Sequence, residues 1–228
     1  MEFNHEMATE YDRGIRRTFP AYEAMFKMTR AYLYHAVGPD AEILLAGAGG
    51  GNELEFFGPP HPNWRFTAVD PSRDMLELAA RKATALGLSE RIRFVEGTVD
   101  NVKDFKLFDA ATCLLVLHFI QDEQEKEELL RSIRKRLKPG APFILAAMYR
   151  QGPVDEFDRL VNLWKVYWLE TTGLSKEEVD KMEESVRSLS FLTEEAMRDL
   201  LHKTGFSTPT KFLQNTFFGC WICHAGQA

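Results

Sequence analysis

The chain has 228 residues, enough for one large domain with its own core and short for two full domains. Apolar residues make up 45% and charged residues 27%, and no run approaches the ~20 apolar residues of a membrane helix. The net charge of −6 argues against a nucleic-acid substrate, which requires basic surface. Residues 1–6 show no secretory signal, so we expect a cytoplasmic protein that binds neither membrane nor nucleic acid.

Along the chain, apolar side chains at helical spacing predict a helix over residues 20–37, which Gly38-Pro39-Asp40 ends. From there short apolar runs alternate with helical patterns, which predicts βαβ units and a parallel sheet. The ligand site of such a sheet lies at the carboxyl ends of its strands. The predicted strands are Glu42–Ala46, Arg65–Val69, Arg91–Glu96, Asp109–Leu115 and Phe143–Met148, and the predicted helices between them are Gly51–Phe57, Ser72–Leu86 and Asp122–Leu137.

The pattern changes after the fifth strand. Residues 154–188 predict two helices with no strand between them, and a helix over Thr193–Thr204 follows. The predicted strands Phe206–Leu213 and Thr216–His224 meet at Gln214-Asn215, too close for a parallel crossover, so they form an antiparallel hairpin. We therefore expect an α/β fold with a doubly wound, seven-stranded, mostly parallel sheet. Its parts are an N-terminal helical cover (1–40) and the ligand-binding domain (41–228), which includes a helical lid (152–190).

Three cysteines raise the question of a metal or redox site. Cys220 and Cys223 have the spacing of a ligand pair, but they lie in an apolar run that predicts a strand. Residues three apart on a strand point to opposite faces. The histidines have no ligand spacing either. We expect packed thiols, including Cys113, and no metal.

The segment Ile43–Asn52 carries the clearest binding signal, since a strand leads into clustered glycines and then a helix. Glycine lets the backbone adopt positive φ and lets a ligand approach the main chain. We expect Asn52 to cap the helix, with Glu55 completing a capping box. Asp70 ends the second strand, where a carboxylate can accept hydrogen bonds from both ribose hydroxyls. Asn52 breaks the dinucleotide pattern G-x-G-x-x-G, which disfavours a nicotinamide dehydrogenase.

In motif order, residues 42–148 resemble the class I S-adenosylmethionine-dependent methyltransferases. LLAGAGGGN is similar to the first motif, FTAVDPSRDMLELA to the second, RIRFVEGTVDNV to the third and FDAATCLLVLHFI to the fourth. LRSIRKRLKPGAPFILA resembles the entry to the fifth strand, and the hairpin suits the reversed seventh strand. The resemblance implies S-adenosylmethionine as cofactor and S-adenosylhomocysteine as product. It implies these cofactor-binding residues: Tyr11, Gly47, Ala48, Gly49, Gly51, Asp70, Pro71, Met75, Gly97, Thr98, Val99, Leu114 and Leu115.

Two positions depart from the family pattern. Leu45 stands where the first motif usually carries an acid for the methionine amino group, and Thr98 stands where the third motif usually carries Asp for the adenine. Losing a charged partner costs about 1.5–3 kcal/mol, which leaves a non-catalytic relative as one alternative. TFPAYEAMFKM, LHFI and FFGCW resemble the carboxy-S-adenosylmethionine synthase branch, which modifies the cofactor itself, and this alternative also stays open.

Methyl transfer depends mostly on positioning the acceptor, and an oxygen or nitrogen acceptor can also need a base. His118, after the fourth strand, is the first candidate base, and Tyr149, after the fifth, is the second. The insertion is expected to lie over the site, although aromatic side chains at helical spacing also suit a core. We expect a small, partly apolar acceptor and a monomer or homodimer. The candidate substrate-binding residues are Arg16, Tyr22, His118, Trp164 and Trp168.

Overall fold

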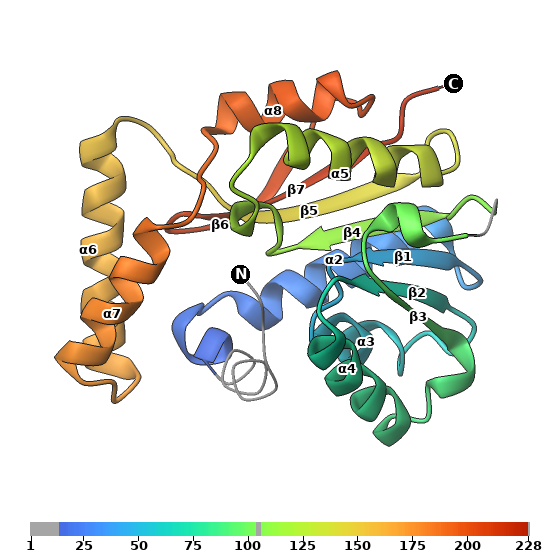
Figure 1. The fold of residues 1–228 in the computed structure, drawn as a ribbon, viewed down its shortest axis with the longest axis horizontal. Coiled ribbons are helices and arrows are strands. Elements are labelled where there is room, and N and C mark those ends of the chain that lie inside the picture. Colours follow the sequence, from blue (N-terminus) through green and yellow to red (C-terminus); the bar gives the residue numbers. More distant parts are fainter. Residues whose placement is uncertain (1–13, 104–105, 228) are drawn as a thin grey trace.

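The computed structural model describes residues 14–103 and 106–227, and a seven-stranded sheet lies at its centre. The strand order is β3-β2-β1-β4-β5-β7-β6, and β7 runs antiparallel to both of its neighbours (Figure 1). This arrangement confirms the predicted α/β sheet and its terminal hairpin. The strands are β1 (Glu42–Ala46), β2 (Arg65–Asp70), β3 (Ile92–Glu96), β4 (Ala110–Leu114), β5 (Pro142–Met148), β6 (Thr210–Asn215) and β7 (Phe218–His224).

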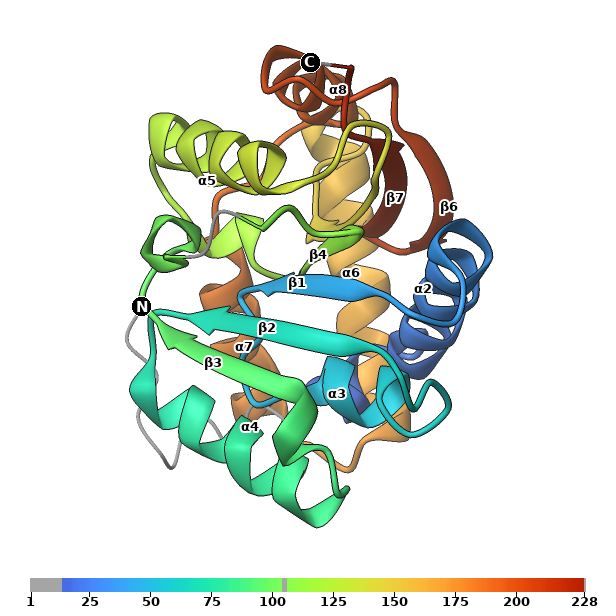
Figure 2. The same cartoon turned by 90° about the vertical axis from the view of Figure 1, so that its right-hand side faces the viewer.

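Helices cover both faces of the sheet, as a doubly wound fold requires (Figures 1 and 2). Each face has its own buried apolar cluster, because the side chains of a strand alternate between the two faces. One face carries α2 (Tyr22–Val37), α3 (Asn52–Phe57) and α4 (Arg73–Ala85); the other carries α5 (Glu123–Arg136) and α8 (Glu194–Lys203).

Side-chain caps fix where several helices begin. The Ser72 hydroxyl accepts from the Met75 N–H at the start of α4, and the Asp122 carboxylate accepts from two N–H groups of α5. Thr193 caps α8 in the same way. Each cap satisfies N–H groups that have no partner within the helix. These caps lie within one residue of the predicted helix starts.

The two helices predicted after β5 are α6 (Val154–Thr171) and α7 (Lys176–Arg187). They stand beyond the end of the sheet where β5 leads into α6 (Figure 1). A capping box at Ser175 and Glu178 starts α7. Within residues 14–103 and 106–227, no helix combines the length and hydropathy needed to cross a bilayer.

The three cysteines are buried free thiols. Cys220 belongs to the apolar cluster on the α2–α4 face and Cys223 to the opposite cluster, as their spacing on a strand predicts. Burial raises the pKa of each of these two thiols to about 12. Among the described residues, no group of His, Cys, Asp and Glu side chains is arranged to hold a metal ion.

Two local predictions were wrong. Gly51, not Asn52, occupies the cap position of α3, because the turn requires a left-handed residue there (φ 78°), and the Asn52 side chain bonds elsewhere. The hairpin turn lies at Thr216-Phe217, two residues later than expected, since Asn215 still pairs with Phe218. Thr216 has a positive φ of 51°, as tight hairpin turns often require.

Candidate functional site

The glycine turn between β1 and α3 brings bare main chain to the carboxyl end of the sheet. Gly47, Gly49 and Gly51 all have positive φ, which other residues rarely adopt. A Cβ atom on Gly47 would lie 2.2 Å from a methyl carbon of Val116, and one on Gly51 would lie 2.9 Å from the Ala79 backbone. Gly47 therefore keeps the turn close to the loop after β4, while Gly51 lets α3 pack against α4.

Asp70, the last residue of β2, ties the glycine turn to the neighbouring strand. Its carboxylate accepts from the Gly49 N–H at 2.9 Å and from the Ser72 N–H at 2.9 Å. The side chain is 9% exposed, and burial raises its pKa while the two backbone hydrogen bonds act in the opposite direction. Asp70 thus holds the turn and still faces the space beside it.

A cavity of about 1130 Å³ opens at this end of the sheet. It lies beside the point where the strand order reverses, between β1 and β4, which is where open α/β sheets bind ligands. Predicted cofactor-binding residues that line the cavity are Gly47, Ala48, Gly49, Asp70, Pro71, Met75, Gly97, Thr98, Val99, Leu114 and Leu115. Gly51 is absent from the lining, and Tyr11 lies outside the described residues.

The backbone after β4 is strained where it faces the cavity. Leu115 has a φ of 61°, which is costly for a residue with a Cβ atom, and its N–H donates to the Ala146 carbonyl at 2.7 Å. Across from it, the Thr98 hydroxyl and N–H both donate to the Asn101 side chain, which closes a small turn after β3. Leu115 and Thr98 both line the cavity.

Residues of α2 and the first turn of α3 also line the cavity. Tyr22 lines it and accepts a hydrogen bond from the Asn52 amide at 2.6 Å. Glu53 also lines it, although the sequence gave no separate reason to select this residue. The Glu53 side chain is 4% exposed and accepts a hydrogen bond from the Thr112 hydroxyl at 2.5 Å. Burial raises its pKa to about 8, and the bond from Thr112 opposes that rise.

His118 lies outside the lining of this cavity. It is 1% exposed, and its Nδ1 accepts from the Met148 N–H at 3.1 Å. The neutral ring therefore carries its proton on Nε2, which is buried without a partner among the described residues. Burial, with the nearby Lys126 charge, lowers the pKa of His118 to about 3. The geometry gives His118 a packing role.

The other candidate side chains also contact protein rather than the cavity. Tyr149 is fully buried, and its hydroxyl accepts from Lys211 at 3.0 Å. The indole N–H groups of Trp164 and Trp168 both donate to the Thr18 carbonyl, at 2.8 and 3.0 Å. These aromatic side chains bury apolar area rather than line the cavity.

Arg16 lies close to the cavity without lining it. Its guanidinium forms an ion pair with Glu55 at 2.7 Å and lies 5.6 Å from the centre of the Tyr22 ring. Of the five predicted substrate residues, Tyr22 is the one that lines the cavity.

Comparison with known proteins identifies a domain in the part of the chain that carries most of the cavity lining. Residues 44–143 match the family model described as "Methyltransferase domain". This part of the chain therefore carries a methyltransferase domain. The match spans β1 to β5 and therefore includes the glycine turn, Asp70 and the strained loop after β4.

Individual relatives are distant. The chain is 23% identical to the carboxy-S-adenosyl-L-methionine synthase of Campylobacter lari, over 95% of this chain and 89% of that protein. It is 26% identical to the Campylobacter jejuni protein of the same name, over 90% and 86%. Its fold is similar to that of the 1,6-didemethyltoxoflavin-N1-methyltransferase of Burkholderia thailandensis, with a TM-score of 0.64, 21% identity and coverage of 97% and 86%.

The cavity fits S-adenosylmethionine, the cofactor that the sequence resemblance implies. The cofactor carries a sulfonium and an ammonium group, so an acidic lining favours its binding. Six of the lining residues are acidic and one, Arg73, is basic. The bare main chain of the glycine turn and the Asp70 carboxylate supply the close approach and the hydrogen-bond acceptor that an adenosyl group requires.

Proposed function

We propose that this methyltransferase transfers the methyl group of S-adenosylmethionine to a small molecule that binds beside the cofactor in the same cavity. The observation that supports this proposal is the size and position of the cavity, which measures about 1130 Å³ and lies at the carboxyl ends of β1, β2 and β4. Drug-sized ligands commonly occupy about 300–1,000 Å³. The cavity therefore has room for the cofactor and a small acceptor together.

Bound S-adenosylmethionine supplies a methyl group that is already activated for in-line displacement at carbon. In our proposal the chain contributes binding and orientation. Asp70 and the glycine turn hold the adenosyl part, while Tyr22, Phe26 and Leu114 border the space left for the acceptor. Alignment of two reacting groups accounts for several kcal/mol of a barrier. Since His118 and Tyr149 do not line the cavity, we propose no side-chain base, which suits an acceptor that is ionised before it binds.

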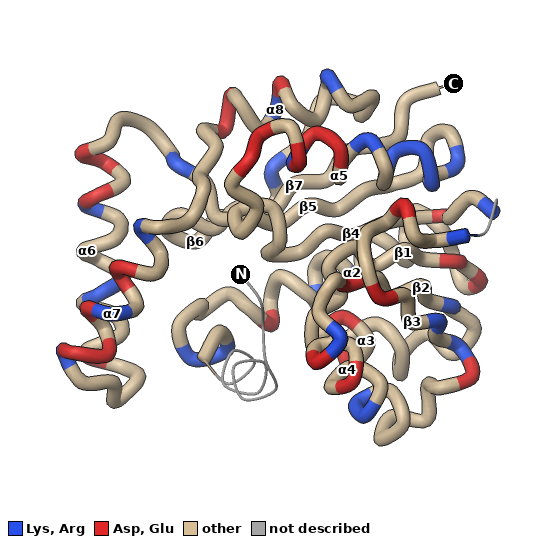
Figure 3. The backbone as a smooth tube through the Cα atoms, in the orientation of Figure 1, with Lys and Arg blue, Asp and Glu red and all other residues tan. Residues whose placement is uncertain are grey.

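The charge around the cavity supports a small acceptor over a nucleic acid. Asp100, Glu125 and Glu128 line the side formed by the β3 loop and the first half of α5. All the acidic residues of the helix lie on that half, together with Lys126, and its other basic residues lie on the second half (Figure 3). A phosphate backbone would meet repulsion at the cavity mouth.

A carboxy-S-adenosylmethionine synthase is the second candidate, because the curated relatives with that name match 90–95% of the chain. A carboxylated cofactor needs a cationic partner for its extra charge. Among the lining residues that the structure describes, Arg73 is the one basic side chain, and it pairs with Glu77 at 3.2 Å beside Asp70. Because that side chain already has an anionic partner, we favour methyl transfer.

Calorimetry and mass spectrometry separate these proposals. We expect S-adenosylmethionine and S-adenosylhomocysteine to bind to the purified protein and NAD not to bind. Mass spectrometry of the nucleoside that remains bound after purification distinguishes the two enzymes. A ligand heavier than S-adenosylmethionine by the mass of CO₂ would support the synthase, whereas formation of S-adenosylhomocysteine with a panel of small acceptors would support methyl transfer.

A further inference from the structure

Glu53 is the buried acid of this cavity that no motif explains. It is the second residue of α3, directly after the glycine turn, and it lines the cavity while being 4% exposed. The Thr112 hydroxyl donates to one carboxyl oxygen, Oε1. In the described part of the chain, no Lys or Arg forms an ion pair with this carboxyl group, and a buried carboxylate without a cation is costly.

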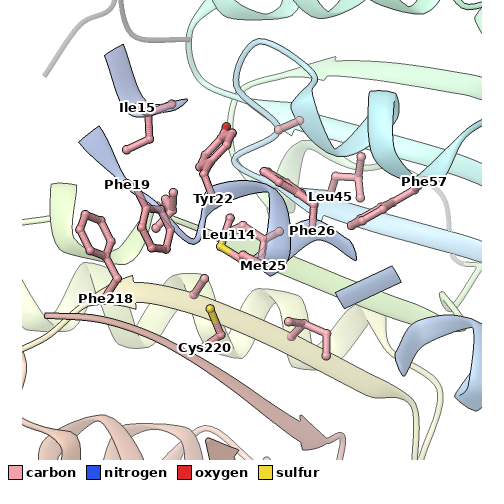
Figure 4. Packing of buried hydrophobic residues seen from close by; sticks show 14 of the residues in the cluster. Ile15, Phe19, Tyr22, Met25, Phe26, Leu45, Phe57, Leu114, Phe218 and Cys220 are labelled. Atoms are coloured by element: carbon pink, nitrogen blue, oxygen red, sulfur yellow. The ribbon is translucent and has the colours of Figure 1, made fainter. Parts of the chain in front are cut away.

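Position 45, where the first motif usually carries an acidic residue, belongs to the hydrophobic core in this protein. Leu45 is fully buried and belongs to the same apolar cluster as Phe26 and Phe57 (Figure 4). A leucine side chain has no polar or charged group to offer a ligand at that position. The site of the missing acid is nevertheless close to Glu53, as the sheet register shows.

Leu45 of β1 and Thr112 of β4 are register partners in the parallel sheet. Register partners on adjacent strands project to the same face, so the Thr112 side chain stands beside Leu45 on the face covered by α3. The hydrogen bond from Thr112 then places the Glu53 carboxyl group above this strand pair. A carboxyl group on α3 therefore lies beside the strand position that Leu45 occupies.

We propose that Glu53 binds the α-ammonium group in the methionine part of S-adenosylmethionine. The inference rests on that cofactor occupying the cavity, with its adenosyl end at Asp70 on β2. Glu53 faces the cavity from the β1–β4 side of the glycine turn, and Asp70 from the β2 side. A ligand held by Asp70 that extends across the turn brings its amino-acid end to Glu53. Its cation supplies the partner that the buried carboxyl group lacks.

The decisive experiment compares two ligands that differ in the amino-acid end. S-adenosylhomocysteine carries the ammonium group, whereas 5′-methylthioadenosine keeps the adenosine and thioether without it. Glu53→Gln keeps an acceptor for Thr112 and removes the charge. We expect calorimetry to show at least a tenfold loss of S-adenosylhomocysteine affinity in this variant, with 5′-methylthioadenosine affinity within twofold of the wild type. Retained binding of 5′-methylthioadenosine also reports that the variant is folded.

Glu55→Gln is the matched control. Glu55 lies in the same turn of α3 but pairs with Arg16 and does not line the cavity. We expect it to bind both ligands as the wild type does. An equal loss of both ligands in Glu53→Gln would overturn the proposal, because Glu53 would then only shape the cavity. A loss of S-adenosylmethionine binding without a loss of S-adenosylhomocysteine binding would also overturn it, by assigning Glu53 to the sulfonium.

Proton release gives a second readout. The bound cation favours ionised Glu53, so at pH 7 the wild type releases close to one proton on binding S-adenosylhomocysteine, because burial holds the pKa of free Glu53 at about 8. Titration in two buffers of different ionisation enthalpy measures this release. Other titratable side chains lie on the elements packed around Glu53, namely Tyr22, Lys82, Cys113 and Asp70. Any proton that these groups release on ligand binding is also released in Glu53→Gln.

The difference in proton release between the wild type and Glu53→Gln therefore reports the ionisation of Glu53. Equal proton release in both proteins would overturn the proposal. A wild-type protein that binds neither ligand would overturn the proposed function together with this inference. Wild-type binding of both ligands with an unchanged Glu53→Gln variant would overturn the inference alone.

Discussion

The cavity wall and the aromatic side chains outside it differ in the contacts that hold them. In the wall, main-chain groups of the glycine turn bond to the end of β2, and the Asp70 side chain faces the cavity. Outside it, His118 Nδ1 and the indole N–H groups of Trp164 and Trp168 bond to backbone groups, and all three side chains pack into the core. The glycine motif, which sets the path of the backbone, therefore predicted where the cavity lies. The presence of a reactive side chain such as His118 did not.

The largest effect is expected where bare main chain forms the wall. Gly47→Ala places a Cβ atom 2.2 Å from the Val116 side chain at a φ of +73°. We expect at least a 100-fold loss of S-adenosylhomocysteine affinity, about 2.7 kcal/mol, measured by calorimetry.

Gly87→Ala is the control, since its φ is +69° and nothing lies within 4 Å of the added atom. This variant should lose only about 1 kcal/mol of stability and no affinity. Equal affinity losses in the two variants would contradict the role of close approach at Gly47.

The next prediction tests the packing role of His118 through pH. Its folded pKa of about 3 lies below the ordinary value of 6.5, so the unfolded chain takes up the proton first. The stability contributed by the neutral ring is therefore present above pH 6.5 and is lost as pH falls toward 3. Between pH 6.5 and 5 this loss is about 2 kcal/mol.

His118→Asn keeps an acceptor for the Met148 N–H and should flatten the dependence of unfolding free energy on pH, measured by denaturant titration. Turnover should stay within threefold of the wild type. A 100-fold drop in kcat with the fold retained would show that His118 takes part in catalysis, which would contradict its packing role.

Asp70→Ala should lower cofactor affinity at least tenfold, about 1.4 kcal/mol. The substitution removes the acceptor proposed for the ribose and leaves the Gly49 and Ser72 N–H groups without their partner. Asp74→Ala is the control, because Asp74 lines the same cavity from the first turn of α4. Isothermal titration of both variants gives the difference, and equal affinities would place the ribose elsewhere.

The smallest effect belongs to the tryptophan pair. Trp164→Phe removes one of the two N–H donors to the Thr18 carbonyl, so we expect a loss of about 1 kcal/mol of stability and unchanged cofactor affinity. Trp168→Phe should behave in the same way. Thermal unfolding and calorimetry check both variants, and a tenfold affinity loss in either would bring that side chain into the cavity.

The sequence by itself determined the strand and helix order, the reversed last strand, and the placement of the glycine turn and Asp70 at the ends of neighbouring strands. These features follow from local rules, since hydrophobic period, turn residues and strand-to-loop junctions act over a few neighbouring residues. The element boundaries mostly fell within one or two residues of the structure. The exceptions were the start of β6 and the hairpin turn, which the register of β6 on β7 decided.

Only the tertiary structure decided which side chains face the cavity. His118 and Glu53 both follow strand-to-loop junctions, yet one is turned into the core by the Met148 N–H and the other is held at the cavity by Thr112. Those partners are 30 and 59 residues away in the chain, so no local pattern could report them. The acid missing at Leu45 and the acid present at Glu53 become related only when β1 and β4 lie side by side.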